Sequence, residues 1–378
     1  MSSELKPKIR FKGFTDDWEQ RKLKEMTLYK NGTGHEDKQS SNGRYELINL
    51  NSVSIDGGLK SSGKFIDDSN ETLKKNDLVM VLSDVGHGDL LGRVALIPTN
   101  NKFVLNQRVA LLRPNGTINP RFLFTCINAG QNYFKMNGAG SSQLNISREV
   151  VEKFEPFVPK KEEQQKISTI FESLDNLITL HQRKCDKLIE LKKSLLEKMF
   201  PQNNSVIPEI RFKGFTDDWE QRKLGDECFE LMAGGDIDKT RSVNNGKYPI
   251  YANALTNEGI VGYYNDSYRV KSPAVTITGR GEIGYAMARN TDFTPVVRLI
   301  SLRSKHNNYF LANAINLLSV VSESTGVPQL TIPQVEKFDI YFPKKINEEI
   351  KLGRLFNEID NLITLYQRKH DKLNKIKQ

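Results

Sequence analysis

The chain has 378 residues, of which 38% are hydrophobic and 27% are charged, a composition typical of a soluble protein with room for two or three domains. No apolar run is long enough to span a bilayer, and the polar N-terminus lacks the apolar core of a signal peptide, which predicts a cytoplasmic protein with no membrane partner. The net charge of +9 is compatible with a nucleic-acid partner but does not require one.

The chain repeats its own opening segment. Residues 9–23 read IRFKGFTDDWEQRKL, and residues 210–224 read the same fifteen letters. Residues 24–150 and 225–334, which follow the two copies, differ almost throughout. Drift after a duplication would have changed all parts alike, so matched ends around different middles favour one scaffold that presents two recognition surfaces.

The first of these middles has the pattern of a mixed α/β domain. Apolar runs at Leu78–Leu82 and Arg93–Ile97 flank a glycine-rich loop, which predicts a hairpin. A short helix is expected at Pro120–Asn128, and the domain closes on QLNI at Gln143–Ile146.

A long helix follows, and a second copy of it ends the chain. FESLDNLITLHQRKCDKL at Phe171–Leu188 returns as FNEIDNLITLYQRKHDKL at Phe356–Leu373. In both copies apolar residues recur in steps of three and four, and neither helix can bury such a stripe alone, so each is the natural partner of the other. His181 and Cys185 are expected to pack rather than to bind a metal. The residues predicted to hold the two spacer helices together are Leu174, Leu177, Leu188, Ile359, Leu362 and Leu373.

Phe200-Pro201 ends the first helix, and a linker leads to the second variable middle. There Ala274–Thr278 and Tyr285–Ala288 flank GRGEIG, which predicts a hairpin at the place that corresponds to the first one. The three glycines also spell a dinucleotide fingerprint, but that motif must open a helix, and a strand is expected here. A short helix at Asn308–Leu318 and QLTI at Gln329–Ile332 complete the outline.

Polar and aromatic residues near the predicted loops and strand ends are candidates for reading DNA, because arginine matches guanine while asparagine and glutamine match adenine. In the first domain the candidates are Lys38, Arg44, Tyr45, Asn49, Asn51, His87, Arg93, Gln107 and Arg108. In the second domain they are Lys239, Arg241, Tyr248, Tyr251, Asn253, Arg280, Tyr285 and Arg298.

Motifs for catalysis are missing from the sequence. We find no Walker A sequence, no HExxH, no GxSxG and no metal-spaced group among the five histidines. The sequence therefore predicts a protein that is not itself an enzyme, with no catalytic residues and no metal site.

With this order of repeated and variable segments, the chain resembles the specificity subunits of type I restriction-modification enzymes. The resemblance is carried by IRFKGFTDDWEQRKL in each half, by QLNI and QLTI, and by LDNLITL and IDNLITL in the two helices. It implies an α+β fold with two pseudo-symmetric mixed α/β target recognition domains, separated by two long helices that form an antiparallel coiled coil.

The resemblance also implies a function and partners. Each domain would read one half-site of a bipartite, asymmetric target in double-stranded DNA. The chain would bind two methyltransferase subunits, which methylate adenine, and restriction subunits, which cleave DNA. It would hold no cofactor itself, whereas S-adenosylmethionine, ATP and Mg would belong to the partner subunits.

The expected organisation has five parts. Residues 1–158 hold the first repeated segment and recognition domain, 159–200 the central spacer helix, 201–209 the linker, 210–342 the second repeated segment and recognition domain, and 343–378 the C-terminal spacer helix. An alternative function with the same outline is a coiled-coil scaffold that joins two protein-binding domains.

Overall fold

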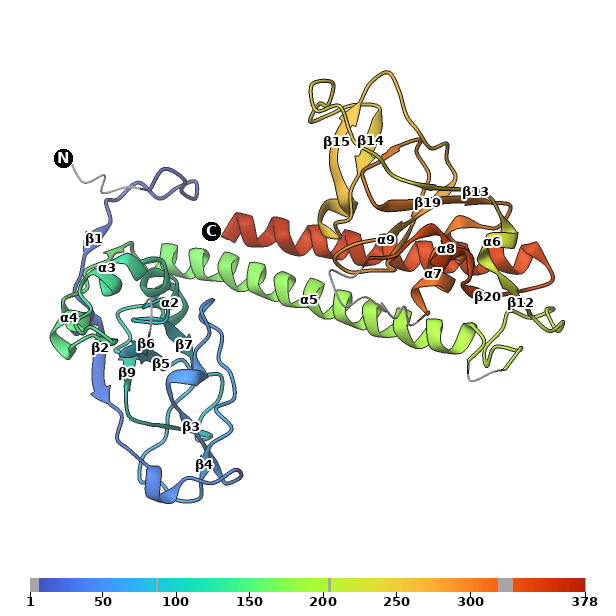
Figure 1. The fold of residues 1–378 in the computed structure, drawn as a ribbon. Coiled ribbons are helices and arrows are strands. Elements are labelled where there is room, and N and C mark those ends of the chain that lie inside the picture. Colours follow the sequence, from blue (N-terminus) through green and yellow to red (C-terminus); the bar gives the residue numbers. More distant parts are fainter. Residues whose placement is uncertain (1–6, 86–87, 203–204, 319–328, 378) are drawn as a thin grey trace. The chain divides into compact units, whose positions relative to one another are not determined.

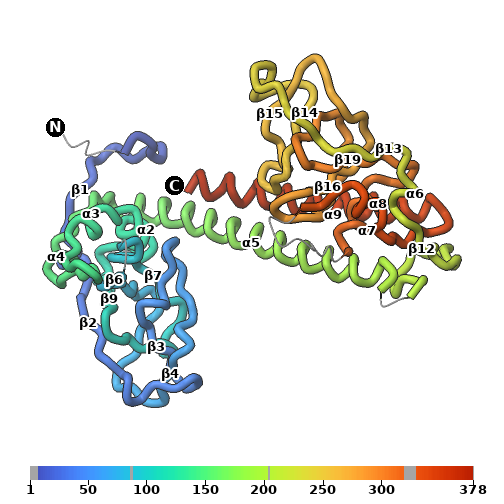
Figure 2. The backbone as a smooth tube through the Cα atoms, viewed as in Figure 1, coloured from blue at the N-terminus to red at the C-terminus, as the bar shows by residue number. Residues whose placement is uncertain are grey.

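The structure is a computed structural model that describes residues 7–85, 88–202, 205–318 and 329–377. The chain divides into two units, residues 1–176 with Lys377 and residues 177–376 with residue 378 (Figure 1). Each unit contains a mixed α/β domain, and one long helix, α5 (Lys161–Met199), begins in the first unit and ends in the second. The tube in Figure 2 follows the backbone through the same elements.

The first domain is built on a four-stranded antiparallel sheet in the order β2-β9-β5-β7. Its inner strand β5 alternates: Leu78 and Met80 join the core beneath the helices, whereas Val79 and Val81 face a second core. That second core lies toward the three-stranded sheet β4-β3-β8, in which β3 and β8 run parallel. The helical elements and strands of this unit before α5 are β1 (Glu19–Gln20), α1 (Leu23–Met26), β2 (Thr27–Asn31), η1 (Glu36–Lys38), β3 (Tyr45–Ile48), η2 (Leu50–Ser52), β4 (Phe65–Ile66), β5 (Leu78–Val81), β6 (Ser83–Val85), β7 (Val94–Leu96), β8 (Phe103–Leu105), β9 (Val109–Pro114), α2 (Pro120–Ala129), α3 (Gln131–Met136), β10 (Gln143–Asn145), α4 (Arg148–Lys153) and β11 (Phe157–Val158).

The second domain repeats the two main sheets of the first, whereas the two-stranded sheet of β6 and β10 in the first domain has no counterpart among the described strands of the second. Its four-stranded sheet has the order β13-β19-β16-β17, and its three-stranded sheet has the order β15-β14-β18, again with one parallel pair, β14 and β18. Both predicted hairpins are confirmed, since β5 pairs with β7 and β16 with β17 in antiparallel register. The elements of the second unit are β12 (Glu220–Lys223), α6 (Leu224–Glu227), β13 (Cys228–Ala233), β14 (Tyr248–Tyr251), η3 (Thr256–Gly259), β15 (Ile260–Tyr264), β16 (Ala274–Thr278), β17 (Ala286–Arg289), β18 (Thr294–Pro295), β19 (Leu299–Ser304), α7 (Asn308–Asn316), α8 (Ile332–Glu336), β20 (Asp339–Phe342) and α9 (Ile346–Lys377).

The repeated opening segment is held against the start of a long helix in each unit. Arg10 makes two hydrogen bonds to Glu163 near the start of α5, and Arg211 makes the same two to Glu348 near the start of α9. The strand that follows the segment pairs with the strand before the helix, β1 with β11 and β12 with β20. The segment that is repeated letter for letter therefore joins each domain to its long helix.

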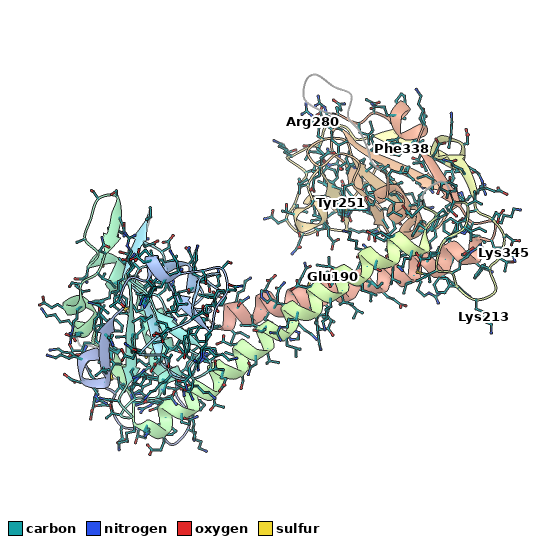
Figure 3. All side chains as sticks on the ribbon, turned by 90° about the horizontal axis from the view of Figure 1, so that it is seen from below. Glu190, Lys213, Tyr251, Arg280, Phe338 and Lys345 are labelled. Carbon is teal, nitrogen blue, oxygen red and sulfur yellow. The ribbon has the colours of Figure 1, made fainter. Side chains whose placement is uncertain are left out.

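Within the second unit, α5 and α9 lie side by side as an antiparallel coiled coil (Figures 1 and 3). The ring of His181 lies 5.6 Å from that of Tyr366, and Lys192 forms an ion pair with Asp360 at 2.6 Å. Later positions on α5 thus meet earlier positions on α9, which sets the antiparallel direction and confirms the predicted coiled coil.

The residues that face inward in the coiled coil differ in part from the expected ones. Leu188 and Leu373 are half-buried as expected, but Leu177 and Leu362 are 43% and 42% exposed. The inward row of α5 runs through Ile178, His181, Cys185, Leu188, Lys192, Leu195 and Met199, and that of α9 through Leu352, Phe356, Ile359, Ile363, Tyr366, His370 and Leu373. Leu174 is also half-buried and Ile359 is buried, so four of the six predicted residues are covered, and only Leu177 and Leu362 are replaced by their neighbours Ile178 and Ile363.

Candidate nucleic-acid interface

The candidate interface of the second domain is centred on the hairpin between β16 and β17. The turn needs glycine, because Gly281 and Gly284 have φ values of 72° and 84°, a conformation that other residues adopt at a steric cost. Arg280 is exposed at the tip of this turn (Figure 3). Tyr285, 41% exposed, follows on the return side, where its carbonyl accepts a hydrogen bond from the Thr278 N–H.

Two further candidates lie on loops beside this hairpin. The side chain of Asn253 accepts a hydrogen bond from the Gly279 N–H at 2.8 Å and donates one to the Val297 carbonyl at 3.1 Å. A Cβ at Gly279 would lie 2.2 Å from the carbonyl oxygen of Arg298, so only glycine fits there. The structure thus brings Asn253, Arg280, Tyr285 and Arg298 together, and we call these four residues the hairpin cluster.

Three candidates of the second domain lie elsewhere, around the three-stranded sheet. Arg241 pairs with Asp266 at 2.7 Å, which raises the pKa of the guanidinium through a hydrogen bond. Tyr248 opens β14 and contacts the ring of Tyr268 at 4.9 Å, and Lys239 is exposed. Within the described residues, no hydrogen bond, ion pair or ring contact links these three residues to the hairpin cluster.

Tyr251 corrects one expectation, because the structure places it in the core. It is 7% exposed and packs against Phe293 at 5.2 Å, while the Arg289 guanidinium lies 3.6 Å from its ring centroid. Burial raises the pKa of the Tyr251 hydroxyl and lowers that of Arg289. The ring completes the packing at the end of β14 and is not open to a DNA duplex.

In the first domain the corresponding loops carry Lys38, Gln107 and Arg108. The side chain of Gln107 donates a hydrogen bond to Glu36, which shares η1 with Lys38. Arg108 is exposed, and its carbonyl accepts a hydrogen bond from the Leu82 N–H at the end of β5. These three residues are therefore neighbours on two adjoining loops.

A second basic position is shared by both domains. The Arg44 guanidinium lies 5.1 Å from the ring centroid of Tyr45, and the Lys247 ammonium lies 4.8 Å from that of Tyr248. Lys247 was missed among the candidates. The signal that could have found it is the match between NGRY at residues 42–45 and NGKY at residues 245–248.

Other candidates of the first domain have roles within the fold. Asn49 caps η2 by accepting a hydrogen bond from the Asn51 N–H at 2.9 Å. Arg93 donates to the Asn128 carbonyl near the end of α2 at 3.0 Å, and burial lowers the pKa of its guanidinium. Both Asn49 and Arg93 are only half-exposed, which leaves less of each to reach a base. His87 lies outside the described residues.

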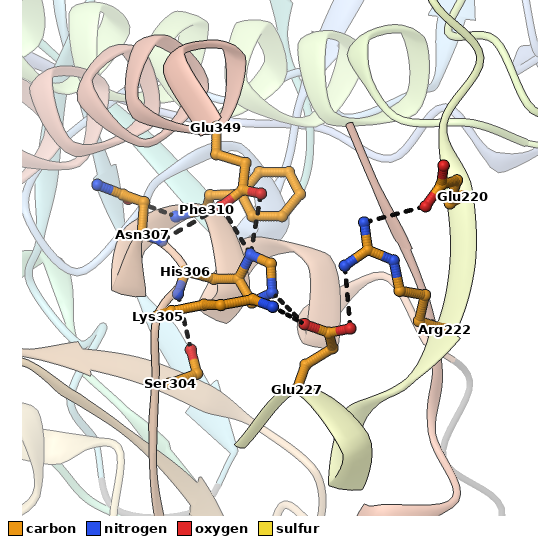
Figure 4. A network of polar contacts seen from close by, with 9 residues as sticks. All are labelled: Glu220, Arg222, Glu227, Ser304, Lys305, His306, Asn307, Phe310 and Glu349. Atoms are coloured by element: carbon orange, nitrogen blue, oxygen red, sulfur yellow. Dashed lines mark hydrogen bonds and ion pairs between the residues drawn. The ribbon is translucent and has the colours of Figure 1, made fainter. Parts of the chain in front are cut away.

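A buried charged network fastens the second domain to α9 (Figure 4). The ring of His306, with a side chain 4% exposed, contacts Glu349 through Nδ1 at 2.9 Å and Glu227 through Nε2 at 2.8 Å. Arg222 and Lys305 also pair with Glu227. Burial opposes charge on His306, but the hydrogen bonds to Glu349 and Glu227 outweigh it and raise the pKa of the imidazole.

The same network acts on Glu227. Burial would raise its pKa, but hydrogen bonds from His306, Arg222 and Lys305 lower it to about 2. Clustered groups with shifted pKa values can mark a catalytic site. Here each group is directed at another member of the network, and His306, Glu227 and Glu349 at its centre are buried, so the cluster is a structural joint.

Among the described residues, no group of three or more His, Cys, Asp or Glu side chains is arranged to hold a metal ion. The described helices include none that is long and apolar enough to cross a membrane. The geometry is that of a surface for binding, formed by loops that two related scaffolds present.

Comparisons with known proteins agree with this geometry. Residues 15–190 and 216–375 match the family model described as the type I restriction modification DNA specificity domain. A protein of Mycoplasma pneumoniae named as a type I specificity subunit is 27% identical over 259 residues, which cover 66% of this chain and 68% of that protein. The MjaVIII specificity subunit of Methanocaldococcus jannaschii is 21% identical over 84% of this chain and 80% of its own length.

Solved structures show the same fold. The S subunit of a type I restriction-modification system from M. genitalium superposes with a TM-score of 0.74 at 16% identity, over 98% of this chain and 96% of that one. A chain from a study of complex assembly and conformational transition of the type I R-M system gives a TM-score of 0.51 at 14% identity, over 95% of each chain. Since the family model covers both halves, the chain belongs to the type I restriction-modification DNA specificity family and is a type I specificity subunit.

Proposed function

We propose that the chain reads a bipartite, asymmetric site in double-stranded DNA, with one half-site for each domain. The observation that carries this proposal is that the two main sheets of the two domains have the same strand order and directions while their loops differ. One scaffold with two sets of loops can present two sets of base contacts. The net charge of +9 favours a polyanionic partner.

The residues that contact DNA belong to the loops described above. In the second domain they are Asn253, Arg280, Tyr285 and Arg298, and in the first domain Lys38, Gln107 and Arg108. Among them, Arg280 can recognise guanine through two hydrogen bonds, and Asn253 and Gln107 can recognise adenine in the same way. Lys239, Arg44 and Asn51 remain candidates for further contacts, whereas Arg241 is already paired with Asp266.

The long helices would set the distance between the half-sites. Helix α5 has 39 residues and α9 has 32, and at about 1.5 Å per residue a helix of roughly 36 residues is about 55 Å long. This is more than one turn of duplex, roughly 34 to 36 Å. Because each domain has a finite width, we expect an unread gap of about 5 to 8 base pairs.

The partners would be methyltransferase and restriction subunits, which would supply the catalysis that this subunit lacks. Two methyltransferase subunits would dock on the two repeated segments, since the chain offers these in near-identical form. The complex would methylate adenine with S-adenosylmethionine and cleave DNA with ATP and Mg, all bound by the partners in the cytoplasm.

A mobility-shift experiment on the full chain with duplex DNA at two salt concentrations tests the DNA proposal. DNA binding should weaken steeply as salt rises, because phosphate contacts release counterions. The alternative, a coiled-coil scaffold for two protein-binding domains, would give no retention of duplex at either concentration.

A further inference from the structure

Arg108 and Arg298 occupy the same place in two domains whose loops otherwise differ. Arg108 precedes β9, and Arg298 precedes β19, the strand with the same position in its sheet. Just before them, Asn106 and Val296 donate backbone hydrogen bonds to the carbonyls of Ile48 and Tyr251, the last residues of β3 and β14. The two arginines are therefore equivalent in topology as well as in sequence order.

The loops around the two arginines are closed in the same way. The N–H of Gly32 donates to the Val109 carbonyl, and the N–H of Gly234 donates to the Leu299 carbonyl. A Cβ at Gly32 would lie 1.7 Å from the Asn106 carbonyl oxygen, and one at Gly234 would lie 2.0 Å from that of Val296. Each domain thus has glycine at the point where a neighbouring loop packs against the arginine-bearing turn.

Both arginines have a backbone conformation that side chains disfavour. The φ value is 64° at Arg108 and 71° at Arg298, in the left-handed region where glycine and asparagine are the usual residues. A residue held in this region at a steric cost points to a function for its side chain. Glycine would satisfy the backbone at both positions, yet both domains have arginine.

Contacts inside their own domains do not explain why arginine occupies these two positions. Within the described residues, no hydrogen bond or ion pair joins either guanidinium to another side chain; Arg108 is exposed, and Arg298 is half-buried with its buried Nη1 unpaired. Their neighbours also differ. The preceding residue is Gln107 in the first domain and Val297 in the second, and the residue next to the arginine carbonyl is Leu82 in the first domain and Gly279 in the second. The arginine is constant while the residues around it change.

We propose that Arg108 and Arg298 contact the phosphate backbone, one in each half-site, and add affinity without selecting the sequence. The inference rests on the proposed DNA-binding function. Two half-sites of different sequence share their phosphates, so a residue retained in both domains suits a phosphate contact. Residues that differ between the domains, Arg280 among them, are then the ones that read bases.

Because both arginines have a left-handed backbone conformation, each can be replaced by glycine without disturbing the fold. Arg108→Gly and Arg298→Gly remove the guanidinium and relieve the backbone, so the melting temperature should stay constant or rise. Asn76→Gly is the matched control. Asn76 also has a positive φ, of 71°, but it lies before β5, at the opposite end of that strand from Leu82, which contacts Arg108. Arg108→Lys and Arg298→Lys keep the charge.

Binding of the full-length variants to a mixed-sequence duplex is measured by fluorescence anisotropy over a range of salt concentrations. Each glycine variant should bind roughly tenfold more weakly, and the slope of log affinity against log salt should fall by about one for each arginine removed. The lysine variants and Asn76→Gly should retain most of the affinity. The motif enriched from a random duplex pool should be the same for all variants.

Three results would overturn the inference: unchanged affinity in the glycine variants, a changed motif, which would make the arginines base readers, or a melting temperature lowered by several degrees, which would make them structural. Failure of the proposed function itself has a separate signature, since the unaltered chain would then not retain duplex at any salt concentration.

Discussion

Arg211 and Glu348 form a two-point ion pair with distances of 2.7 and 2.8 Å, and Glu348 is 1% exposed. Arg10 and Glu163 form the same pair at 2.7 Å for both bonds, with Glu163 also 1% exposed. Each pair joins the repeated segment to the start of a long helix. The most constant part of the sequence is thus the part that fixes each domain to its helix.

We expect Glu348→Gln to lower the free energy of unfolding of the second unit by about 3 kcal/mol, because it leaves the guanidinium of Arg211, 12% exposed, without its carboxylate. Urea unfolding followed by fluorescence measures the change. Glu209→Gln removes an exposed pair with Lys198 at 2.8 Å and should cost less than about 1 kcal/mol. Equal effects of the two substitutions would show that the buried pair has no special role.

The stability of the second unit should depend on pH through His306. The folded pKa of this histidine is raised above its ordinary 6.5, so its contribution is fully present below about pH 6.5 and is lost as pH rises through the folded pKa. Glu227, with a folded pKa of about 2 against an ordinary 4.5, loses its contribution as pH falls from about 4.5 to 2. The second unit should therefore be most stable between these limits, near pH 5 to 6.

The first domain supplies the control for this pH dependence. Met26 ends α1 where Glu227 ends α6, Ile118 precedes the helix cap Asn119 as His306 precedes Asn307, and Gln164 follows Glu163 as Glu349 follows Glu348. The triple variant Glu227→Met, His306→Ile, Glu349→Gln copies this uncharged set. Its melting temperature should change less between pH 6 and pH 9 than that of the unaltered chain, and an identical decline in both would remove His306 as the cause.

The sequence predicted the architecture well because the repeat exposes it. Copies of one segment mark where each domain begins, and the glycine-rich turns mark the hairpins at equivalent places. The positions of Tyr251 and Asn49 could not be predicted in this way. The local sequence is the same whether a tyrosine at a strand end faces solvent or packs in the core. It is also the same whether a loop asparagine is free or caps a helix. Only tertiary packing decides between the two outcomes in each case.

The helix row was predicted with the correct period, but some of its positions are displaced by one residue. Leucines at positions 177 and 191 favoured an inward row through these positions, but in the structure the neighbouring residues Ile178, Cys185 and Lys192 face inward. Lys192 can lie there because Asp360 neutralises its ammonium, and the aliphatic part of the lysine side chain packs as an apolar residue does. A pairing between distant residues of this kind leaves no mark in the local pattern.

The inward row allows a sharper test of the helices as a ruler. Inserting seven residues into each helix, after Ile178 and after Ile363, keeps the heptad phase and lengthens the coiled coil by about 10 Å. At about 3.4 Å per base pair, the unread gap should grow by about three base pairs while both half-sites stay the same. A constant gap would show that the helices do not set the spacing.

Arg280→Ala should affect one half-site alone. Removing a guanidinium that reads guanine should cost about 1 to 3 kcal/mol of discrimination at one position of the second half-site, and the first half-site should be unchanged. Selection from a random duplex pool gives both motifs in one experiment. Arg241→Ala serves as the matched control, since Asp266 already pairs with that arginine; a broadened first half-site in the Arg280 variant would contradict the assignment.

Single-molecule sequencing of methylated adenine in the source cells, with and without this gene, tests the central claim most directly. We expect one bipartite asymmetric motif, with a gap of about 5 to 8 base pairs, to be methylated only when the gene is present. Replacing residues 24–150 with the domain of another family member should change one half of that motif and keep the gap. A methylation pattern that does not depend on the gene, or a contiguous palindromic motif, would contradict the assignment of one half-site to each domain.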